Sequence, residues 1–191
     1  MADVFTVLAQ DHQEVQAMLA ELEKGPTRAT GASEDQLALR KRMTETLIIE
    51  ESKHEALEEM YFWPAVREHH SAGDTLADEA TTQEQEAKHV LAELDKLDAS
   101  DTRFEELLSE FTGAAREHIA FEENEVWPGL RSVLSAEVSG ELGTKIAEGK
   151  KTAPTRPHPH TPASPSVLKT AGTAVAAADK ARDAASGRGG D

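Results

Sequence analysis

The sequence has no cysteine in its 191 residues. This absence excludes disulfide bonds, zinc ribbons, Cys-ligated iron–sulfur clusters and cysteine nucleophiles. Any metal ion must therefore be held by nitrogen and oxygen atoms. Aromatic residues make up only 4 % of the chain and hydrophobic residues 38 %. The hydrophobic fraction is low for a compact domain of this length, so we expect part of the chain not to pack.

Long apolar runs are also missing. No stretch approaches the roughly 20 apolar residues that a membrane helix needs, and the first residues lack the basic run and apolar core of a signal peptide. The net charge of −16 is uneven, since residues 1–149 hold 13 Lys/Arg against 33 Asp/Glu and residues 150–191 hold 7 against 3. An acidic body disfavours nucleic acid and anionic membranes. We therefore expect a soluble, cytoplasmic protein without either partner.

Proline and glycine divide the first 149 residues into segments whose apolar residues recur at helical spacing. The expected helices span residues 3–24, 33–68, 75–98, 102–132 and 135–148. Four long helices joined by short loops are typical of a bundle. The predicted fold class is therefore all-α: an up-down-up-down antiparallel four-helix bundle with a short fifth helix, forming a single domain over residues 1–149.

Residues 150–191 have a different composition. Five prolines between Ala153 and Ser166 forbid a regular helix there. The Ala-rich stretch 167–186 would be marginal as an isolated helix in water. We predict a basic, largely disordered tail, in which His158 and His160 are linker residues rather than metal ligands.

One eleven-residue pattern, His-x-x-x-Glu-Glu-x-x-x-Trp-Pro, occurs twice in the chain. It begins at His54 and again at His118, and it uses both tryptophans. Residues four apart on a helix lie one turn apart on the same face. Each copy therefore projects an imidazole beside a carboxylate: His54 with Glu58, and His118 with Glu122.

Both His/Glu pairs lie on the apolar stripe of their helices and so face the predicted core. His12 lies on the apolar stripe of the first helix and adds a third inward imidazole. His89 falls roughly 100° from the stripe of the third helix and shares its face with Glu86 and Glu93. Buried carboxylates are costly unless they are paired or bind a metal.

Inward carboxylates and imidazoles on opposed helices are the way bundles build dinuclear metal sites. This pattern predicts such a site, and the alternative is a buried polar network that fixes the register of a metal-free bundle. Nitrogen and oxygen ligands of this kind suit a di-iron or di-manganese pair better than tetrahedral zinc.

With these motifs the sequence resembles the hemerythrin-like family, also called the HHE cation-binding domain, and among its members the mycobacterial proteins. The resemblance covers residues 1 to about 133 and rests on Asp11-His12, on both copies of the repeated motif, and on His89 before a Leu-x-x-Leu run. It implies two iron ions joined by an oxo or hydroxo bridge, with manganese as the alternative metal. The ligands that it implies by position are His12, His54, Glu58, His89, His118 and Glu122, with Glu58 and Glu122 as bridges.

The resemblance also bears on neighbouring residues and on function. In some relatives the residue after the second-helix histidine approaches the metal, which is Glu55 here. Tyr61 shares the stripe of Glu58 and is a candidate ligand or hydrogen-bond donor to a bound oxygen species, while a core tyrosine is the plainer interpretation. Oxygen-carrying hemerythrins are similar but use five histidines, so reversible oxygen carriage is not expected.

The resemblance favours an enzyme that decomposes hydrogen peroxide in a catalase-like reaction. The alternative is a non-enzymatic sensor or store for oxygen, nitric oxide or iron. In either case the expected partners are small molecules.

Overall fold

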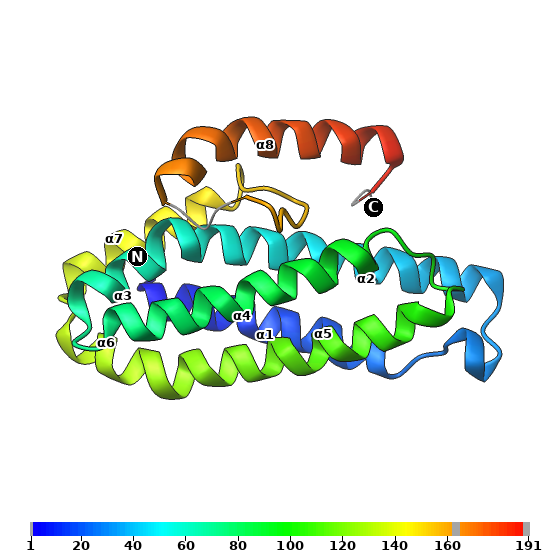
Figure 1. The fold of residues 1–191 in the computed structure, drawn as a ribbon, viewed down its shortest axis with the longest axis horizontal. Coiled ribbons are helices and arrows are strands. Elements are labelled where there is room, and N and C mark those ends of the chain that lie inside the picture. Colours follow the sequence, from blue (N-terminus) through cyan, green and yellow to red (C-terminus); the bar gives the residue numbers. More distant parts are fainter. Residues whose placement is uncertain (1, 162–164, 189–191) are drawn as a thin grey trace.

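The computed structural model describes residues 2–161 and 165–188, which form helices and connecting loops with no strand among them. The α-helices are α1 (Val4–Glu23), α2 (Glu34–Leu57), α3 (Trp63–His69), α4 (Gly73–Leu94), α5 (Thr102–Phe121), α6 (Trp127–Val133), α7 (Ala136–Gly149) and α8 (Pro165–Ser186). A 3-10 turn, η1 (Arg28–Thr30), and two π-helical segments, η2 (Glu58–Phe62) and η3 (Glu122–Val126), complete the described elements. Helices α1, α2, α4 and α5 form an antiparallel four-helix bundle, as predicted (Figure 1).

Capping residues fix where several of these helices begin. Asp3, Ser33 and Asp101 each accept a hydrogen bond from a backbone N–H of the first turn, as good N-cap residues do. Ser33 also forms a capping box with Gln36. These helices therefore begin within a residue of their predicted starts, whereas α4 begins two residues early and ends four residues before the predicted boundary.

The two π-helical segments follow from the Trp-Pro dipeptides of the repeated motif. Proline has no N–H, and its ring crowds the carbonyl four residues earlier. The helix therefore widens before Pro64, where the Trp63 N–H donates to the Glu58 carbonyl five residues back. The Trp127 N–H donates to the Glu122 carbonyl in the same way. Each π segment begins at the glutamate of its motif, and such segments are frequent at functional sites.

The core consists of two apolar clusters separated by a polar layer. One cluster, near α3, α6 and α7, includes Phe5 and Phe62, and the other, toward the opposite end of the bundle, includes Phe104 and Phe111. On α1, His12 lies between the two clusters, because Leu8 belongs to the first and Val15 to the second. The bundle therefore places polar side chains at mid-height, where apolar residues enclose them from both ends.

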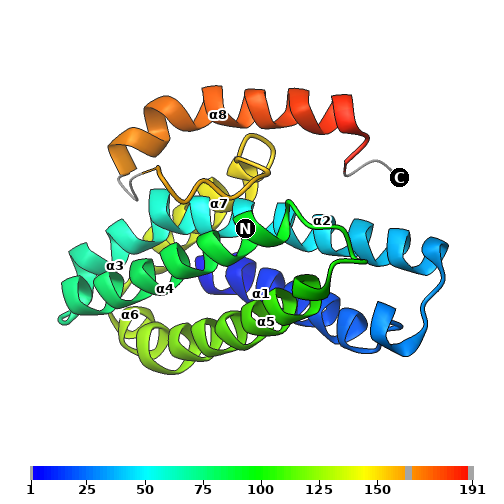
Figure 2. The same ribbon diagram turned by 45° about the vertical axis from the view of Figure 1, so that its right-hand side comes forward.

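The chain beyond α7 returns over the bundle, and α8 runs along the outer side of α2 (Figures 1 and 2). Arg156 pairs with Asp183 at 2.7 Å, and His158 pairs with Asp179 at 2.8 Å. This arrangement differs from the predicted disordered tail. The prediction treated the Ala-rich helix as isolated, whereas the two aspartates, one turn apart on α8, face the basic loop before it.

None of the helices in the described ranges is long and apolar enough to cross a membrane.

Candidate metal centre

Six side chains from the four bundle helices and the two π segments converge in the polar layer. Ligand atoms of His12, His54, Glu58 and Glu122 lie within 4.8 Å of one another, and so do those of Glu58, Glu84, His118 and Glu122. Glu58 and Glu122 belong to both groups. Two metal ions that share a pair of carboxylates would need this overlap.

Buried polar atoms without a hydrogen-bond partner gather at this point. They include both carboxylate oxygens of Glu58 and of Glu122, Oε2 of Glu84, and Nε2 of His12 and of His118. The Nε2 atom of His12 lies 3.1 Å from Glu122 Oε2, but the contact lacks hydrogen-bond geometry. Buried groups of this kind are costly unless something binds them. Their lone pairs suit a metal ion, so the residues present fit a dinuclear site.

Each histidine of the cluster directs Nε2 toward the carboxylates and Nδ1 toward an outer oxygen. The Nδ1 contacts are His12 to Glu123 at 2.9 Å, His54 to Asp11 at 3.5 Å, and His118 to Gln83 at 2.9 Å. Metal-binding histidines usually donate their second N–H to such an acceptor, which fixes the tautomer and the ring orientation. Asp11 in turn accepts a hydrogen bond from Lys150 at the end of α7.

The carboxylates of the cluster differ in their affinity for protons. Burial, reinforced by the charges of Glu122 and Glu84, raises the pKa of Glu58 well above its usual value. Burial and neighbouring carboxylates raise the pKa of Glu84 as well. Burial alone would raise the pKa of Glu122, but contacts with His118 and His12 lower it instead. Metal binding would therefore displace protons from Glu58 and Glu84.

Both motif tryptophans pack against candidate ligands. Trp127 stacks on the His12 ring at a centroid distance of 5.2 Å and an interplanar angle of 13°. Trp63 meets the His118 ring edge-on at 6.4 Å, and its indole N–H donates to Glu84. The Trp-Pro dipeptide thus both shapes the helix and restrains the ligands.

Five of the six predicted ligands come together, and His89 does not. Its side chain is exposed on α4, with its ring 5.8 Å from that of His160 and its Nε2 3.5 Å from Gln85. The position agrees with the helical wheel, which places His89 away from the apolar stripe. The metal role that the family resemblance implied for His89 therefore has no support from its position.

Glu84 supplies the α4 side chain of the cluster and was missed by the sequence analysis. It is 1 % exposed. The sequence did contain a signal for this buried position. One face of α4 is buried along its length, and its residues recur at helical spacing: Ala77, Ala80, Glu84, Ala87 and Leu91. One acidic residue on such a stripe indicates a buried carboxylate, and hence a partner for it.

Tyr61 and Glu55 belong to neither ligand group. Tyr61 is half-buried and lines a surface cleft beside Leu142 of α7. Tyr61 lies inside the π segment η2, where the 3.6-residue period of the helical wheel does not apply, and its role as a ligand or hydrogen-bond donor stays a prediction. Glu55 is 3 % exposed, and burial raises its pKa to about 8 although Lys88 opposes the shift.

A small pocket adjoins the cluster on the side of the second apolar core. His12, His54, Glu84 and His118 line it together with apolar side chains such as Phe111. The space open to the centre of a water-sized molecule is about 20 Å³, and one water needs roughly 10–15 Å³ on this measure. The pocket therefore admits molecules of only a few atoms.

The sequence model of the hemerythrin HHE cation-binding domain matches residues 3–130. A hemerythrin HHE cation-binding domain-containing protein from Mycobacterium kansasii has a similar fold, with a TM-score of 0.65 and 21 % sequence identity over 94 % of this chain and 99 % of that one. None of the curated proteins compared with the chain matches it. The matched range contains both copies of the motif and all six residues of the cluster. The chain therefore belongs to the hemerythrin HHE cation-binding domain family.

Proposed function

We propose that this protein holds two iron ions that share Glu58 and Glu122, and that it decomposes hydrogen peroxide in a catalase-like reaction. The observation that carries the proposal is the pair of overlapping ligand groups at the centre of the bundle. Three imidazoles and three carboxylates form a hard, oxygen-rich donor set that suits iron, with manganese as the alternative metal.

The ligand set and the pocket together favour small oxygen species as reactants. When bound, the metal pair supplies the two-electron redox change that converts two peroxide molecules into one of oxygen and two of water. The pocket admits a molecule of this size and excludes larger organic substrates. Glu123, Asp11 and Gln83 hold the outer nitrogens of the three histidines, so these rings keep a fixed orientation.

A sensor of oxygen or nitric oxide is the second candidate. One observation favours it: α8 packs against η2, the segment that begins with Glu58. A movement of Glu58 at the metal site would therefore be transmitted through η2 to α8.

Metal analysis combined with a peroxide assay tests the proposal. The wild-type chain should contain two irons and evolve oxygen from hydrogen peroxide. Glu122→Gln should lose the metal pair, because this carboxylate belongs to both ligand groups. The adjacent Glu123→Gln is the matched control, which should keep two irons because glutamine retains an oxygen that accepts a hydrogen bond from Nδ1 of His12.

Each contrary result has a distinct meaning. Two irons without oxygen evolution would refute the catalase-like reaction and favour the sensor. A folded wild-type protein that binds no iron or manganese would refute the metal site itself, leaving a buried polar network.

A further inference from the structure

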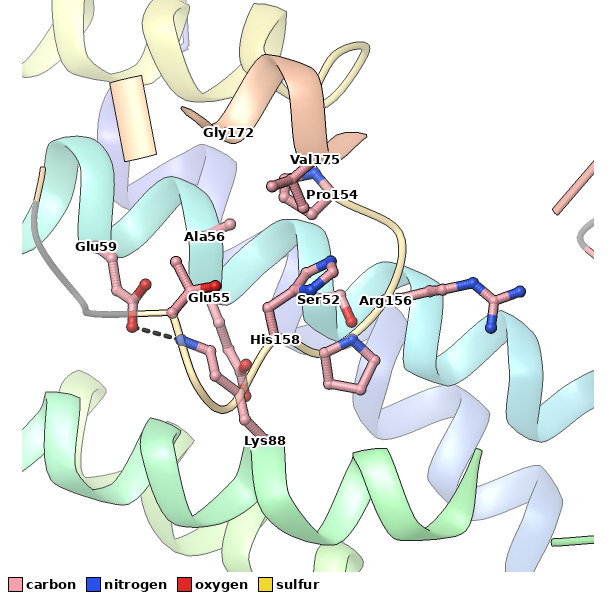
Figure 3. Close-up of a pocket in the computed structure, with 12 residues that line it drawn as sticks. Ser52, Glu55, Ala56, Glu59, Lys88, Pro154, Arg156, His158, Gly172 and Val175 are labelled. Atoms are coloured by element: carbon pink, nitrogen blue, oxygen red, sulfur yellow. Dashed lines mark hydrogen bonds and ion pairs between the residues drawn. The ribbon is translucent and has the colours of Figure 1, made fainter. Parts of the chain in front are cut away.

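A second pocket lies beside the metal pocket, between α2, η2 and α4 on its inner side and the C-terminal segment on its outer side. Its inner wall includes Ser52, Glu55, Glu59 and Lys88, and its outer wall is formed by residues 154–161 and part of α8. Figure 3 shows the loop that carries Pro154 and His158 passing over Glu55 and Lys88. We call this space the outer chamber.

Glu55 connects the outer chamber with the metal pocket, because its side chain lines both. His54 and Glu84, which also line the metal pocket, are buried inside the bundle. The outer chamber, in contrast, is bounded on its outer side by the chain that follows α7. The two spaces therefore share the Glu55 side chain, and the outer chamber lies on the side of the C-terminal segment.

The polar groups of the outer chamber define what it would bind. Ser52 Oγ and Glu55 Oε2 are buried without a hydrogen-bond partner, and each residue is 3 % exposed. The Lys88 ammonium donates to Glu59 and has two further N–H groups. The space open to a water-sized molecule is about 30 Å³, which holds about two waters. A very small molecule that both donates and accepts hydrogen bonds fits these groups.

The outer wall is attached to the bundle by a cluster of ion pairs. Arg156 Nη1 and Arg188 Nη1 lie 3.1 and 3.0 Å from the same oxygen, Oδ2 of Asp95, at the C-terminal end of α4. Asp183 on α8 joins this cluster through Arg156. One carboxylate of the bundle thus holds two points of the C-terminal segment.

We propose that the outer chamber is a binding site for hydrogen peroxide on its path to the metal pocket, and that the C-terminal segment is its movable outer wall. This inference deepens the proposed function and rests on it for the identity of the ligand. The route itself is tested with azide, a three-atom probe whose binding to ferric iron is followed by absorbance in the full-length, iron-loaded protein.

Filling the chamber should slow the passage of azide. In Ala56→Leu, a larger side chain enters the chamber from α2. We expect azide association and dissociation to slow by the same factor, about tenfold, which corresponds to ~1.4 kcal/mol of added barrier, while the dissociation constant stays unchanged. Ala65→Leu is the matched control, since Ala65 is equally buried but lines the separate cleft beside α7. Val175→Phe fills the chamber from α8 and serves if Ala56→Leu fails to load iron.

Releasing the outer wall should have the opposite effect. Asp95→Asn removes the charge that both arginines contact, so azide should bind and dissociate faster. The control is Glu23→Gln, which breaks the exposed ion pair with Arg116, because neither residue lines the chamber. Wild-type rates in both filling variants would overturn the route, and wild-type rates in Asp95→Asn would overturn the movable wall.

The azide experiment and the peroxide assay test the route and the catalase-like reaction separately. If filling slows azide but no oxygen evolves from peroxide, the chamber stands as a route and the catalase-like reaction falls. If oxygen evolves at the wild-type rate while filling changes no rate, the proposed function stands and the chamber is not its entrance.

Discussion

Replacing Glu84 by glutamine separates the two candidates for the α4 ligand, Glu84 and His89. Glutamine keeps the shape of the side chain and an oxygen to accept the Trp63 indole hydrogen bond, but it removes the negative charge. Glu84 belongs to only one of the two ligand groups. The substitution should therefore empty one metal position and leave the other, so that the iron content falls from two per chain to about one.

The size of the effect follows from the position of Glu84. Outer partners of metal ligands typically contribute 10–100-fold to metal affinity, so the loss of a direct carboxylate ligand should cost that position about 100-fold or more. The metal-free variant should be no less stable than the metal-free wild type, because burial disfavours the ionised carboxylate that the substitution removes. Thermal denaturation of both apoproteins separates a lost ligand from a lost fold.

His89→Ala is the paired variant. His89 is exposed, and substitutions at such positions usually change the free energy of unfolding by less than about 0.5 kcal/mol. It should retain two irons after gel filtration in the presence of a weak chelator. A loss of one iron from His89→Ala, together with two irons in Glu84→Gln, would refute the assignment of Glu84 and restore the ligand that the family resemblance implied.

Three further predictions concern residues around the cluster. Lys150→Met should lower iron affinity by about tenfold, because Lys150 holds Asp11 and Asp11 contacts His54. Lys150→Arg should restore the affinity. Equal iron affinity in both variants, measured by chelator competition, would exclude this role. Burial raises the pKa of Glu51 from 4.5 to about 7, so the folded apoprotein retains a proton that the unfolded chain releases, and its stability falls as pH rises through this window. Glu51→Gln should therefore gain up to roughly 3 kcal/mol on the wild type between pH 4.5 and 7 and no more above pH 7, as urea denaturation will show. Arg40→Met should cost about 2–3 kcal/mol at neutral pH, because the buried guanidinium bridges a carboxylate of α5 and a backbone carbonyl of α1; an unchanged denaturation midpoint would contradict this.

Most of the bundle was predictable because local signals and core periodicity agree over long stretches. The N-caps Asp3, Ser33 and Asp101 mark helix starts, and the apolar stripes show which faces meet. The inward direction of His54 and His118 follows from the same stripes. The boundaries of α4 were less accurate because its first residue, Gly73, has no side-chain cap before it.

The missed features depend on tertiary partners or on a change of helical period. Glu84 has the same helix propensity wherever it points, so only its place on an apolar stripe distinguishes it from the many surface glutamates. Tyr61 lies within a π segment, where the 3.6-residue period on which the helical wheel relies does not hold. The order of α8 depends on contacts from Asp179 and Asp183 to the preceding loop. A prediction from the helix propensity of an isolated segment does not include such tertiary contacts.

The repeated motif makes two similar halves, but the cluster that they form is unequal. Each half contributes a His/Glu pair and a Trp-Pro dipeptide from its second long helix, whereas the first long helices contribute different groups: His12 from α1 and Glu84 from α4. If two metal ions bind, the first ligand group offers one ion two imidazoles besides the shared carboxylates. The second group offers the other ion one imidazole and Glu84. Carboxylates are harder donors than imidazoles and bring negative charge, so the position beside Glu84 would favour the more highly charged ion. The inequality lies on α1 and α4, outside the repeated motif, where a substitution would affect one proposed metal position and leave the shared carboxylates in place.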